Sequence, residues 1–385
     1  TTLDMDAQNA AVAAMQNLPN YYTDSNGLHQ PQGAIVAMNP HNGYIMAMVG
    51  GRGDDSFNRA TQAERQPGSA MKPFVYLAAI QSGKTPGSIV DDSPVTFGSW
   101  SPKNYENDFV GNITYRYALQ HSRNVAAVKI ADEVGMTKVI KLAKEMGIST
   151  LTDQDYNLST ALGGLTHGVT PLEMVQAYGV LANGGIKVQP TAILKIVDRN
   201  GQVVEENSIQ EKRVVDEKDA AIITNMLESV INGGTGGNAA IGRPAAGKTG
   251  TTDDSKDAWF VGYTPDLVAA IWIGDDYGSE TLRGITGGDT PAIMWGQFMA
   301  NALANTPASD FPVPSSAQSA IAEGYFNPVK VQPKKDDKKD DKADKKDDKD
   351  KQKDEKVKEE DQSSKEEVSE PKSNSSKNKK SKKDR

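Results

Sequence analysis

Apolar positions recur along residues 1 to 304 with two spacings, one typical of helices and one typical of strands. Helical spacing predicts helices over residues 4–18, 69–82, 114–134, 137–146, 170–181, 216–231 and 295–304. Short apolar runs predict strands over 33–38, 44–49, 258–263 and 267–273, a strand through Lys248, and a hairpin over 191–206. Strands at both ends with helices between them predict a mixed α/β (α+β) fold, an antiparallel sheet flanked by helices.

Proline and threonine mark the starts of two of these helices. Proline lacks an N–H and is tolerated only in the first turn, so Pro73 places the start of the helix over 69–82 near Ser69. Thr170 is the expected N-cap of the helix over 170–181, because Pro171 fits its first position and Glu173 follows three residues after the cap.

The composition changes sharply near residue 330. Residues 331–385 contain 20 Lys or Arg and 17 Asp or Glu with almost no apolar residues, whereas residues 1–330 contain 23 and 34. We therefore expect a folded domain over 1–329, in which 1–30 is a linker-proximal segment, and a disordered charged tail over 330–385. The acidic balance of the folded part argues against nucleic-acid binding.

Composition also excludes several kinds of chemistry. The 385 residues include no cysteine, which excludes disulfides, thiolate metal ligands and a cysteine nucleophile. The four histidines are scattered, so we expect no metal site and no cofactor.

No run approaches the roughly 18–20 apolar residues of a membrane span, and no signal peptide is present. His121 lies beside Ser122, but such a neighbour is more often a loop residue than part of a Ser-His-Asp triad.

A candidate nucleophile and base lie at one predicted helix start. Ser69 and Lys72 are three residues apart, so their side chains share one helical face. Lys72 is a candidate base for the Ser69 hydroxyl, and the Ser69 N–H is an unpaired donor that offers half of an oxyanion hole. The spacing alone is weak support, because a serine N-cap explains it as well and it recurs in the tail at Ser369 and Lys372.

Two further motifs change this interpretation. Ser122-Arg123-Asn124 precedes an apolar helical stretch, and Lys248-Thr249-Gly250-Thr251 begins a predicted strand pair. The order Ser-x-x-Lys, Ser-x-Asn, Lys-Thr-Gly is the combined signature of penicillin-binding proteins and class A β-lactamases. Each motif is weak alone, and the ordered set in these local contexts is specific.

On these motifs, residues 1 to about 325 resemble the transpeptidase region of class A (bifunctional) penicillin-binding proteins. Further matching segments are 33–38, 57–60, 65–69, 72–74, 102–105, 168–174, 177–178 and 182–185. The resemblance implies the serine β-lactamase-like transpeptidase fold. It also implies a fragment of a longer protein, with an N-terminal membrane anchor and a glycosyltransferase domain, on the extracytoplasmic face of the bacterial cell membrane.

The resemblance assigns roles to the first two motifs. It implies that Ser69 forms an acyl-enzyme with the D-Ala-D-Ala end of a peptidoglycan stem peptide, which an amine of a neighbouring stem then resolves. Lys72 accepts the Ser69 proton, or it stays charged and only orients groups. Ser122 relays the proton to the leaving amine. Asn124 holds Lys72 or binds the peptide amide of the substrate.

The third motif is implied to bind the end of the substrate. Lys248 and the hydroxyls of Thr249 and Thr251 bind its terminal carboxylate, and Gly250 lets its backbone approach closely. The Thr251 N–H joins the Ser69 N–H in the oxyanion hole. Burial and the charge of Lys248 lower the pKa of Lys72. The implied partners are peptidoglycan stem peptides, β-lactam antibiotics that trap Ser69, and cell-wall synthesis proteins.

Two alternatives share the signature. A class A β-lactamase needs a glutamate that activates water, and a Glu-x-x-x-Asn pattern occurs at Glu228 and Asn232. It lies only 20 residues before Lys248, too close to match the loop that those enzymes use, so we interpret it as chance. A non-catalytic β-lactam sensor would usually have lost one motif, whereas all are intact. We therefore expect a D,D-transpeptidase.

Overall fold

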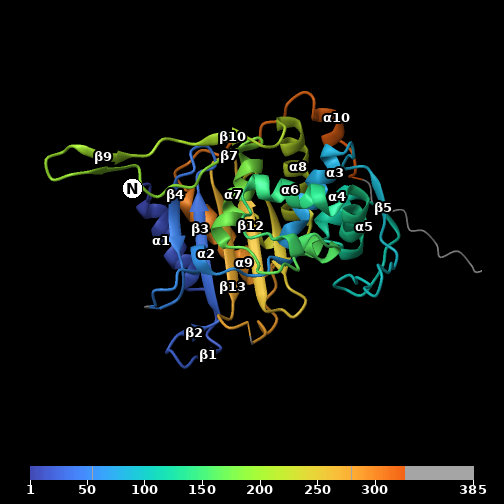
Figure 1. The fold of residues 1–385 in the computed structure, drawn as a ribbon, viewed down its shortest axis with the longest axis horizontal. Coiled ribbons are helices and arrows are strands. Elements are labelled where there is room, and N and C mark those ends of the chain that lie inside the picture. The colour runs from blue at the N-terminus through green and yellow to red at the C-terminus, as the bar shows by residue number, and fades with distance from the viewer. Residues whose placement is uncertain (54, 279, 326–385) are drawn as a thin grey trace, which may run out of the picture. The chain divides into compact units, whose positions relative to one another are not determined.

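The computed structural model describes residues 1–53, 55–278 and 280–325 (Figure 1). The tail predicted over 330–385 lies outside these residues. The central element is a five-stranded antiparallel sheet with the strand order β11-β12-β13-β3-β4. Its strands are β3 Gln32–Met38, β4 Ile45–Val49, β11 Ala246–Thr251, β12 Asp257–Tyr263 and β13 Val268–Gly274. The predicted antiparallel sheet is confirmed, and β3 joins the N-terminal hairpin to the three C-terminal strands by pairing with β13.

Helices cover both faces of this sheet (Figure 1). Successive strand residues point to opposite faces, so β12 supplies Trp259 and Val261 to one core cluster and Ala258 and Phe260 to the other. The first cluster includes α3 Lys72–Gln81, α7 Pro171–Ala182 and α8 Glu217–Gly233, and the second includes α1 Met5–Met15 and α9 Thr290–Ala302.

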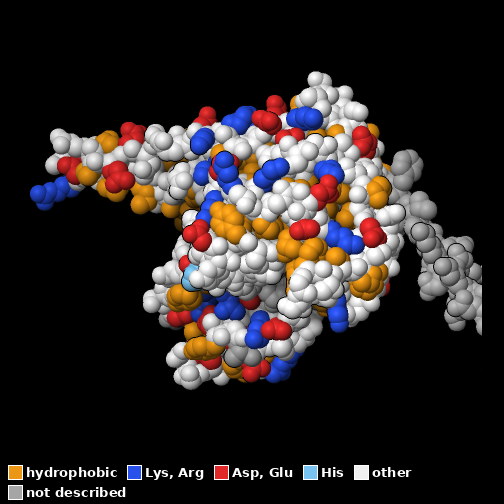
Figure 2. Space-filling view, turned by 45° about the vertical axis from the view of Figure 1, so that its right-hand side comes forward, with side chains coloured by type: hydrophobic (Ala, Val, Ile, Leu, Met, Phe, Trp, Pro, Cys, Tyr) orange, Lys and Arg blue, Asp and Glu red, His pale blue; other side chains and the backbone are white. Residues whose placement is uncertain are grey.

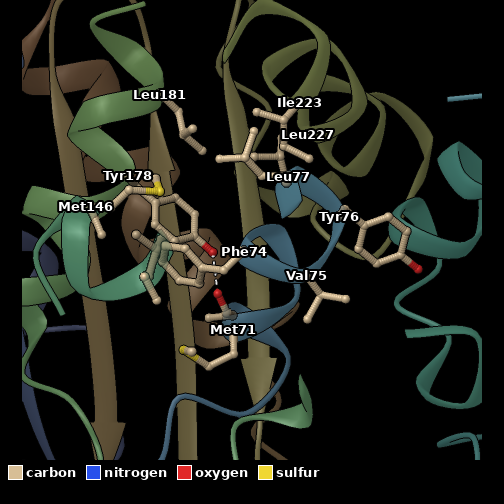
Figure 3. Close-up of a cluster of buried hydrophobic side chains, with 14 of the residues drawn as sticks. Met71, Phe74, Val75, Tyr76, Leu77, Met146, Tyr178, Leu181, Ile223 and Leu227 are labelled. Carbon is tan, nitrogen blue, oxygen red and sulfur yellow. Dashed lines mark hydrogen bonds between the residues drawn. The ribbon is translucent and has the colours of Figure 1, made fainter. Parts of the chain in front are cut away.

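The helices of the first cluster meet around α3, which is buried along almost its whole length. Figure 3 shows Phe74 of α3 beside Tyr178 of α7, and Leu77 beside Leu227 of α8. The rings of Phe74 and Tyr178 are 6.2 Å apart at 83°, the edge-to-face arrangement that aromatic pairs favour. The first turn of α3 is therefore packed against α7, and its middle against α8.

Two predicted helix boundaries differ from the structure. Residues 68–71 form a 3₁₀ turn, η1 Gly68–Met71, and the α-helix begins only at Lys72, with Pro73 in its first turn as predicted. The single helix predicted over 114–134 is wrong, because β6 Asn112–Thr114 and α4 Tyr115–Gln120 precede a break before α5 Asn124–Val134. The break contains Ser122 with φ +53, a left-handed conformation that breaks the helix and that few residues other than glycine adopt.

The other predicted helices and strands agree with the structure to within a few residues. The capping box of Thr170 and Glu173 is present at the start of α7, α6 spans Met136–Met146, and α9 begins earlier than predicted because Pro291 fits its first turn. The predicted hairpin forms from β8 Lys195–Val197 and β9 Val203–Glu206, and Figure 2 shows it projecting with exposed apolar side chains. Among the described residues, no helix is both long and apolar enough to cross a membrane.

Several short elements had no clear sequence signal. They are β1 Tyr22–Thr23, β2 His29–Gln30, α2 Arg59–Gln62, β5 Ile89–Asp91, η2 Asp153–Asp155, η3 Leu158–Leu162, β7 Ile186–Val188, β10 Glu211–Arg213, η4 Gly237–Ala239 and α10 Gln318–Ile321. Most are too short for a hydrophobic period to develop.

Candidate active site

The candidate nucleophile Ser69 lies in the 3₁₀ turn η1, which is wedged between α7 and the edge strand β11. Gly68 has φ +54, and a Cβ at this position would lie 2.5 Å from the Thr251 carbonyl oxygen, so only glycine lets the turn pack this closely. On the other side, the buried Tyr178 hydroxyl donates a hydrogen bond to the Ala70 carbonyl at 2.7 Å. This bond is drawn in Figure 3.

The three motifs meet at two buried lysine amines. Lys72 Nζ donates to the Ser122 carbonyl oxygen, to Ser122 Oγ at 3.1 Å and to Asn124 Oδ1 at 2.6 Å. Lys248 Nζ donates to the same Ser122 Oγ at 2.9 Å and to Thr249 Oγ1 at 3.2 Å. Ser122 Oγ therefore bridges both amines, an arrangement through which a proton can be passed.

Both amines are shielded from solvent, and this sets their electrostatics. Lys72 and Lys248 are each 0% exposed. Burial lowers the pKa of Lys72 well below its ordinary range, and the positive charges of Lys248 and Arg123 lower it further. Burial lowers the pKa of Lys248 to about 7. A lysine with a lowered pKa can be neutral near pH 7 and act as a base.

The Ser69 hydroxyl makes no hydrogen bond to any described residue. The amine of Lys72, one turn further along the chain, is bonded to Ser122 and Asn124 instead. The direct contact that proton transfer from Ser69 to Lys72 needs is therefore absent from this state of the site. Catalytic hydrogen bonds often tighten only when substrate is bound, so this geometry leaves the two expected roles of Lys72 open.

Ser69, Ser122, Asn124, Thr249 and Thr251 line one cleft of about 360 Å³, and the two lysines lie behind its wall. The cleft is also lined by residues for which the sequence predicted no site role, which are Tyr105, Glu106, His121, Leu162, Thr235, Asn238, Thr252, Asp253, Thr286, Gly288 and Asp289. They come from loops at the ends of the sheet and helices, where no periodic pattern marks a role.

The hydroxyls of β11 are held by neighbouring loops. Thr249 Oγ1 lies 2.8 Å from Thr235 Oγ1, and Thr251 Oγ1 accepts a hydrogen bond from the Gly287 N–H at 2.9 Å. Gly250 has a different close neighbour from the one expected, because a Cβ there would lie 2.2 Å from the Pro67 carbonyl oxygen. Its missing side chain makes room for the turn before Ser69, and a role toward substrate is left as a prediction.

The loop that contains Lys103 and Asn104, which had no predicted role, orients Asn124. The Asn124 Nδ2 donates to the Lys103 carbonyl at 2.9 Å, which leaves its Oδ1 facing the amine of Lys72. Asn104 Oδ1 accepts hydrogen bonds from the N–H groups of Asn124 at 2.8 Å and Val125 at 3.1 Å. Asn104 thus caps the start of α5 from another segment of the chain.

Two features considered in the sequence are not bonded to the two lysines or to Ser69. His121 lines the cleft, but its ring lies against that of Tyr117, with the ring centroids 4.2 Å apart, and makes no hydrogen bond to any described residue. Glu228 and Asn232 line a separate pocket with Arg116. No group of three or more His, Asp or Glu side chains that could hold a metal ion is found within the described ranges.

The chain is similar to known penicillin-binding proteins in sequence and in structure. The family described as "Penicillin binding protein transpeptidase domain" matches residues 33–280. Penicillin-binding protein 1A of Aquifex aeolicus is 40% identical over 292 residues, which cover 74% of this chain and 40% of that protein. The chain thus spans about 40% of the length of such relatives.

Solved structures give the same match. The PonA1 protein of Mycobacterium tuberculosis in complex with penicillin V is 31% identical, with a TM-score of 0.75, and the alignment covers 86% of this chain and 91% of that one. Penicillin-binding protein 1A of Haemophilus influenzae is 30% identical, with a TM-score of 0.70, over 76% of this chain and 52% of that one.

Proposed function

Since the chain belongs to the family of penicillin-binding protein transpeptidase domains, we propose that it is a D,D-transpeptidase. It cross-links peptidoglycan stem peptides through an acyl-enzyme on Ser69. The observation that carries the proposal is the bridge from Lys72 through Ser122 Oγ to Lys248, which joins three distant segments behind Ser69. Activated serine with a buried lysine base is a recognised route to acyl transfer.

In the acylation step, Ser69 Oγ attacks the carbonyl carbon of the penultimate D-Ala and Lys72, in its neutral form, takes the hydroxyl proton. The proton passes through Ser122 to the nitrogen of the leaving D-Ala as the peptide C–N bond breaks. An ester to Ser69 remains. The hydrogen bond that Lys72 Nζ donates to Asn124 Oδ1 at 2.6 Å keeps the Lys72 amine beside this path.

The substrate is held at its charged end and at its reacting carbonyl. The hydroxyls of Thr249 and Thr251 face the cleft and bind the terminal carboxylate, and Lys248 supplies positive charge behind them. The N–H groups of Ser69 and Thr251 donate to the oxyanion that forms on the carbonyl oxygen. Loss of one such donor costs about 10²- to 10³-fold in rate.

An amine of a second stem peptide then attacks the ester, and its proton returns through the same groups. β-Lactams resemble the D-Ala-D-Ala end and leave a slowly hydrolysed ester on Ser69. A β-lactamase is less well supported, because the Glu-x-x-x-Asn pattern lies in a pocket apart from the cleft. A non-catalytic sensor is less well supported because the side chains of all three motifs meet.

The longer protein to which the chain corresponds would carry further functions. Relatives named penicillin-binding protein 1A are longer than this chain, which covers 40% of their length. In line with the family resemblance, we propose a bifunctional protein with an added glycosyltransferase, anchored by an N-terminal segment at the extracytoplasmic face of the bacterial membrane. Cell-wall synthesis proteins are its candidate partners.

The test is intact-protein mass spectrometry after addition of benzylpenicillin, followed for hours. We expect one stable adduct on the parent chain and none on Ser69→Ala, with the melting temperature nearly unchanged. Ser159→Ala, which alters a surface serine outside the cleft, is the matched control and keeps the adduct. A short-lived adduct with rapid drug hydrolysis would favour the β-lactamase, and an adduct on Ser69→Ala would contradict the nucleophile assignment.

A further inference from the structure

A buried carboxylate outside the cleft, Asp92, is shared by two side chains from other segments. It is 0% exposed. Its Oδ2 accepts a hydrogen bond from the Arg123 Nε–H at 2.9 Å and lies 2.7 Å from Arg123 Nη2. The Asn104 Nδ2 donates to both of its oxygens at 3.1 Å. Asp92 therefore ties together residues 12 and 31 positions away in the chain.

Arg123 connects this carboxylate to the contacts of Lys72. Its guanidinium is 6% exposed and is held from the far side by Asp108, whose Oδ1 lies 2.7 Å from Nη1. A planar guanidinium bound at both ends has one orientation, so the backbone that carries it is fixed as well. The preceding residue is Ser122, whose carbonyl accepts from Lys72 and whose left-handed conformation persists only where its surroundings hold it.

Asn104 connects the same carboxylate to the other contact of Lys72. Because its Nδ2 is bound by Asp92, its Oδ1 faces the start of α5 and accepts the Asn124 N–H at 2.8 Å. The carbonyl of the neighbouring Lys103 accepts a hydrogen bond from the Asn124 Nδ2. Together these bonds leave the Asn124 Oδ1 as the acceptor for Lys72.

We propose that Asp92 is a positioning residue that holds the Ser-Arg-Asn segment (residues 122–124) against the amine of Lys72. It acts through Arg123 and Asn104 and touches no substrate. The inference rests on the proposed function, because that function gives Lys72 and the Ser-Arg-Asn segment their parts in acylation.

The charges around Lys72 allow this role to be told from a purely structural one by the pH dependence of acylation. Lys248 and Arg123 face it as cations and lower its pKa, whereas Asp253 and Asp92 raise it. Removal of the Asp92 charge therefore lowers the pKa of Lys72 further. If acylation needs neutral Lys72, the acid limb of its pH profile moves to lower pH.

The experiment measures the second-order rate constant of acylation by benzylpenicillin across pH for the parent chain, Asp92→Asn and Arg123→Lys. We expect Asp92→Asn to lose about 10²-fold at the plateau, the typical effect of misplacing a catalytic group by about 1 Å, with its acid limb at lower pH. Arg123→Lys keeps the positive charge, but a lysine amine cannot bind Asp92 and Asp108 at once as the guanidinium does. Its acylation rate therefore falls, while the acid limb of its pH profile stays at the parent pH. Asp276→Asn, which removes a carboxylate from another buried arginine, Arg59, is the control and keeps the parent rate and acid limb.

The outcomes separate this inference from the proposed function. If the parent chain itself forms no adduct on Ser69, the proposed function fails. If the parent is acylated and folded Asp92→Asn has an acylation rate within twofold of the parent rate, the inference is overturned. It is also overturned if Asp92→Asn loses no more rate than the control does and its acid limb lies at the parent pH. If Asp92→Asn shows no cooperative unfolding transition, Arg123→Lys decides, and a parent-like rate in that variant overturns the inference.

Discussion

At the scale of single residues, the site depends on two amines that are kept out of water. Removing an ammonium from water is costly, so a buried lysine tends to lose its proton unless acceptors compensate. Lys72 has three acceptors and Lys248 also has three, with Ser122 Oγ common to both. The shared hydroxyl couples the two protonation states, because a proton on one amine disfavours a proton on the other.

The two roles open to Lys72 differ in one variant, Lys72→Arg. Arginine stays protonated at all accessible pH, so it can orient groups but cannot accept the Ser69 proton. We expect its benzylpenicillin acylation rate to fall by at least about 10²-fold, the usual contribution of a general base. Lys129→Arg, whose parent amine binds the Asp91 carbonyl outside the cleft, is the control. A rate within tenfold of the parent would favour the orienting role.

The lowered pKa of Lys248 makes the free energy of unfolding depend on pH. Its pKa is about 7 in the folded chain and 10.5 when solvated. Between these values the unfolded chain binds a proton that the folded chain does not, so the free energy of unfolding rises with pH across this window. Below about pH 7 both states are protonated and the contribution is constant.

Lys248→Met removes that titration and tests the argument. We expect a weaker pH dependence of stability between pH 7 and 10, a free energy of unfolding at pH 7 that is higher by about 1–2 kcal/mol, and strongly slowed acylation. Urea unfolding at several pH values measures the first two. Lys256→Met, at a lysine that is 38% exposed, should keep the parent slope. An undiminished slope in Lys248→Met would contradict the assigned direction.

At the scale of elements, the nucleophile is presented by a turn that neighbours hold on two sides. The β11 backbone meets η1 where Gly68 and Gly250 lack side chains. From the sheet, the Trp259 Nε1–H donates to the Gln66 carbonyl at 2.9 Å just before the turn. The position of Ser69 therefore depends on the packing of α7 and the sheet as much as on its own helix.

Tyr178→Phe tests this dependence. Loss of its hydroxyl leaves the Ala70 carbonyl without its buried donor, which we expect to cost about 1–2 kcal/mol of stability and to slow acylation several-fold. The matched control is Tyr76→Phe, because the hydroxyl of Tyr76 is equally buried and has no hydrogen-bond partner within the described ranges. Thermal unfolding and acylation rates for both variants give the comparison. Equal effects in the two would argue against a role for the Tyr178 anchor.

The limits of sequence-based prediction are clearest at this scale. Hydrophobic period and proline placement predicted the sheet strands and the place of Pro73 in the first turn of α3, because those signals are local. The break at Ser122 was missed, because nothing in a serine marks a positive φ. The partnership of Asp92 with Arg123 was also missed, because it spans 31 positions and each residue alone reads as an ordinary surface charge.

At the scale of the whole molecule, the segment of the described chain that follows α9 packs against the first core cluster through Ala317, Ala320 and Ile321. Arg116 on α4 is 1% exposed and donates to the Ile321 carbonyl at 2.8 Å and the Glu323 carbonyl at 3.1 Å. Its guanidinium also lies 3.9 Å from the ring centre of Tyr325. Residues near 325 therefore complete the environment of a helix that precedes the Ser-Arg-Asn segment.

Two truncations follow from this arrangement. A chain that ends at residue 329 keeps the contacts that Arg116 makes with the described residues. The composition of residues 330–385 predicts no contribution to the fold, so we expect the parent melting temperature and acylation rate. A chain that ends at residue 319 loses both carbonyls and the Tyr325 ring, which should cost about 2–4 kcal/mol because the bonds come from a charged donor. Differential scanning calorimetry measures both. In an Arg116→Met background the shorter truncation should cost clearly less, and an equal cost there would mean that the segment stabilises the domain by contacts other than those of Arg116.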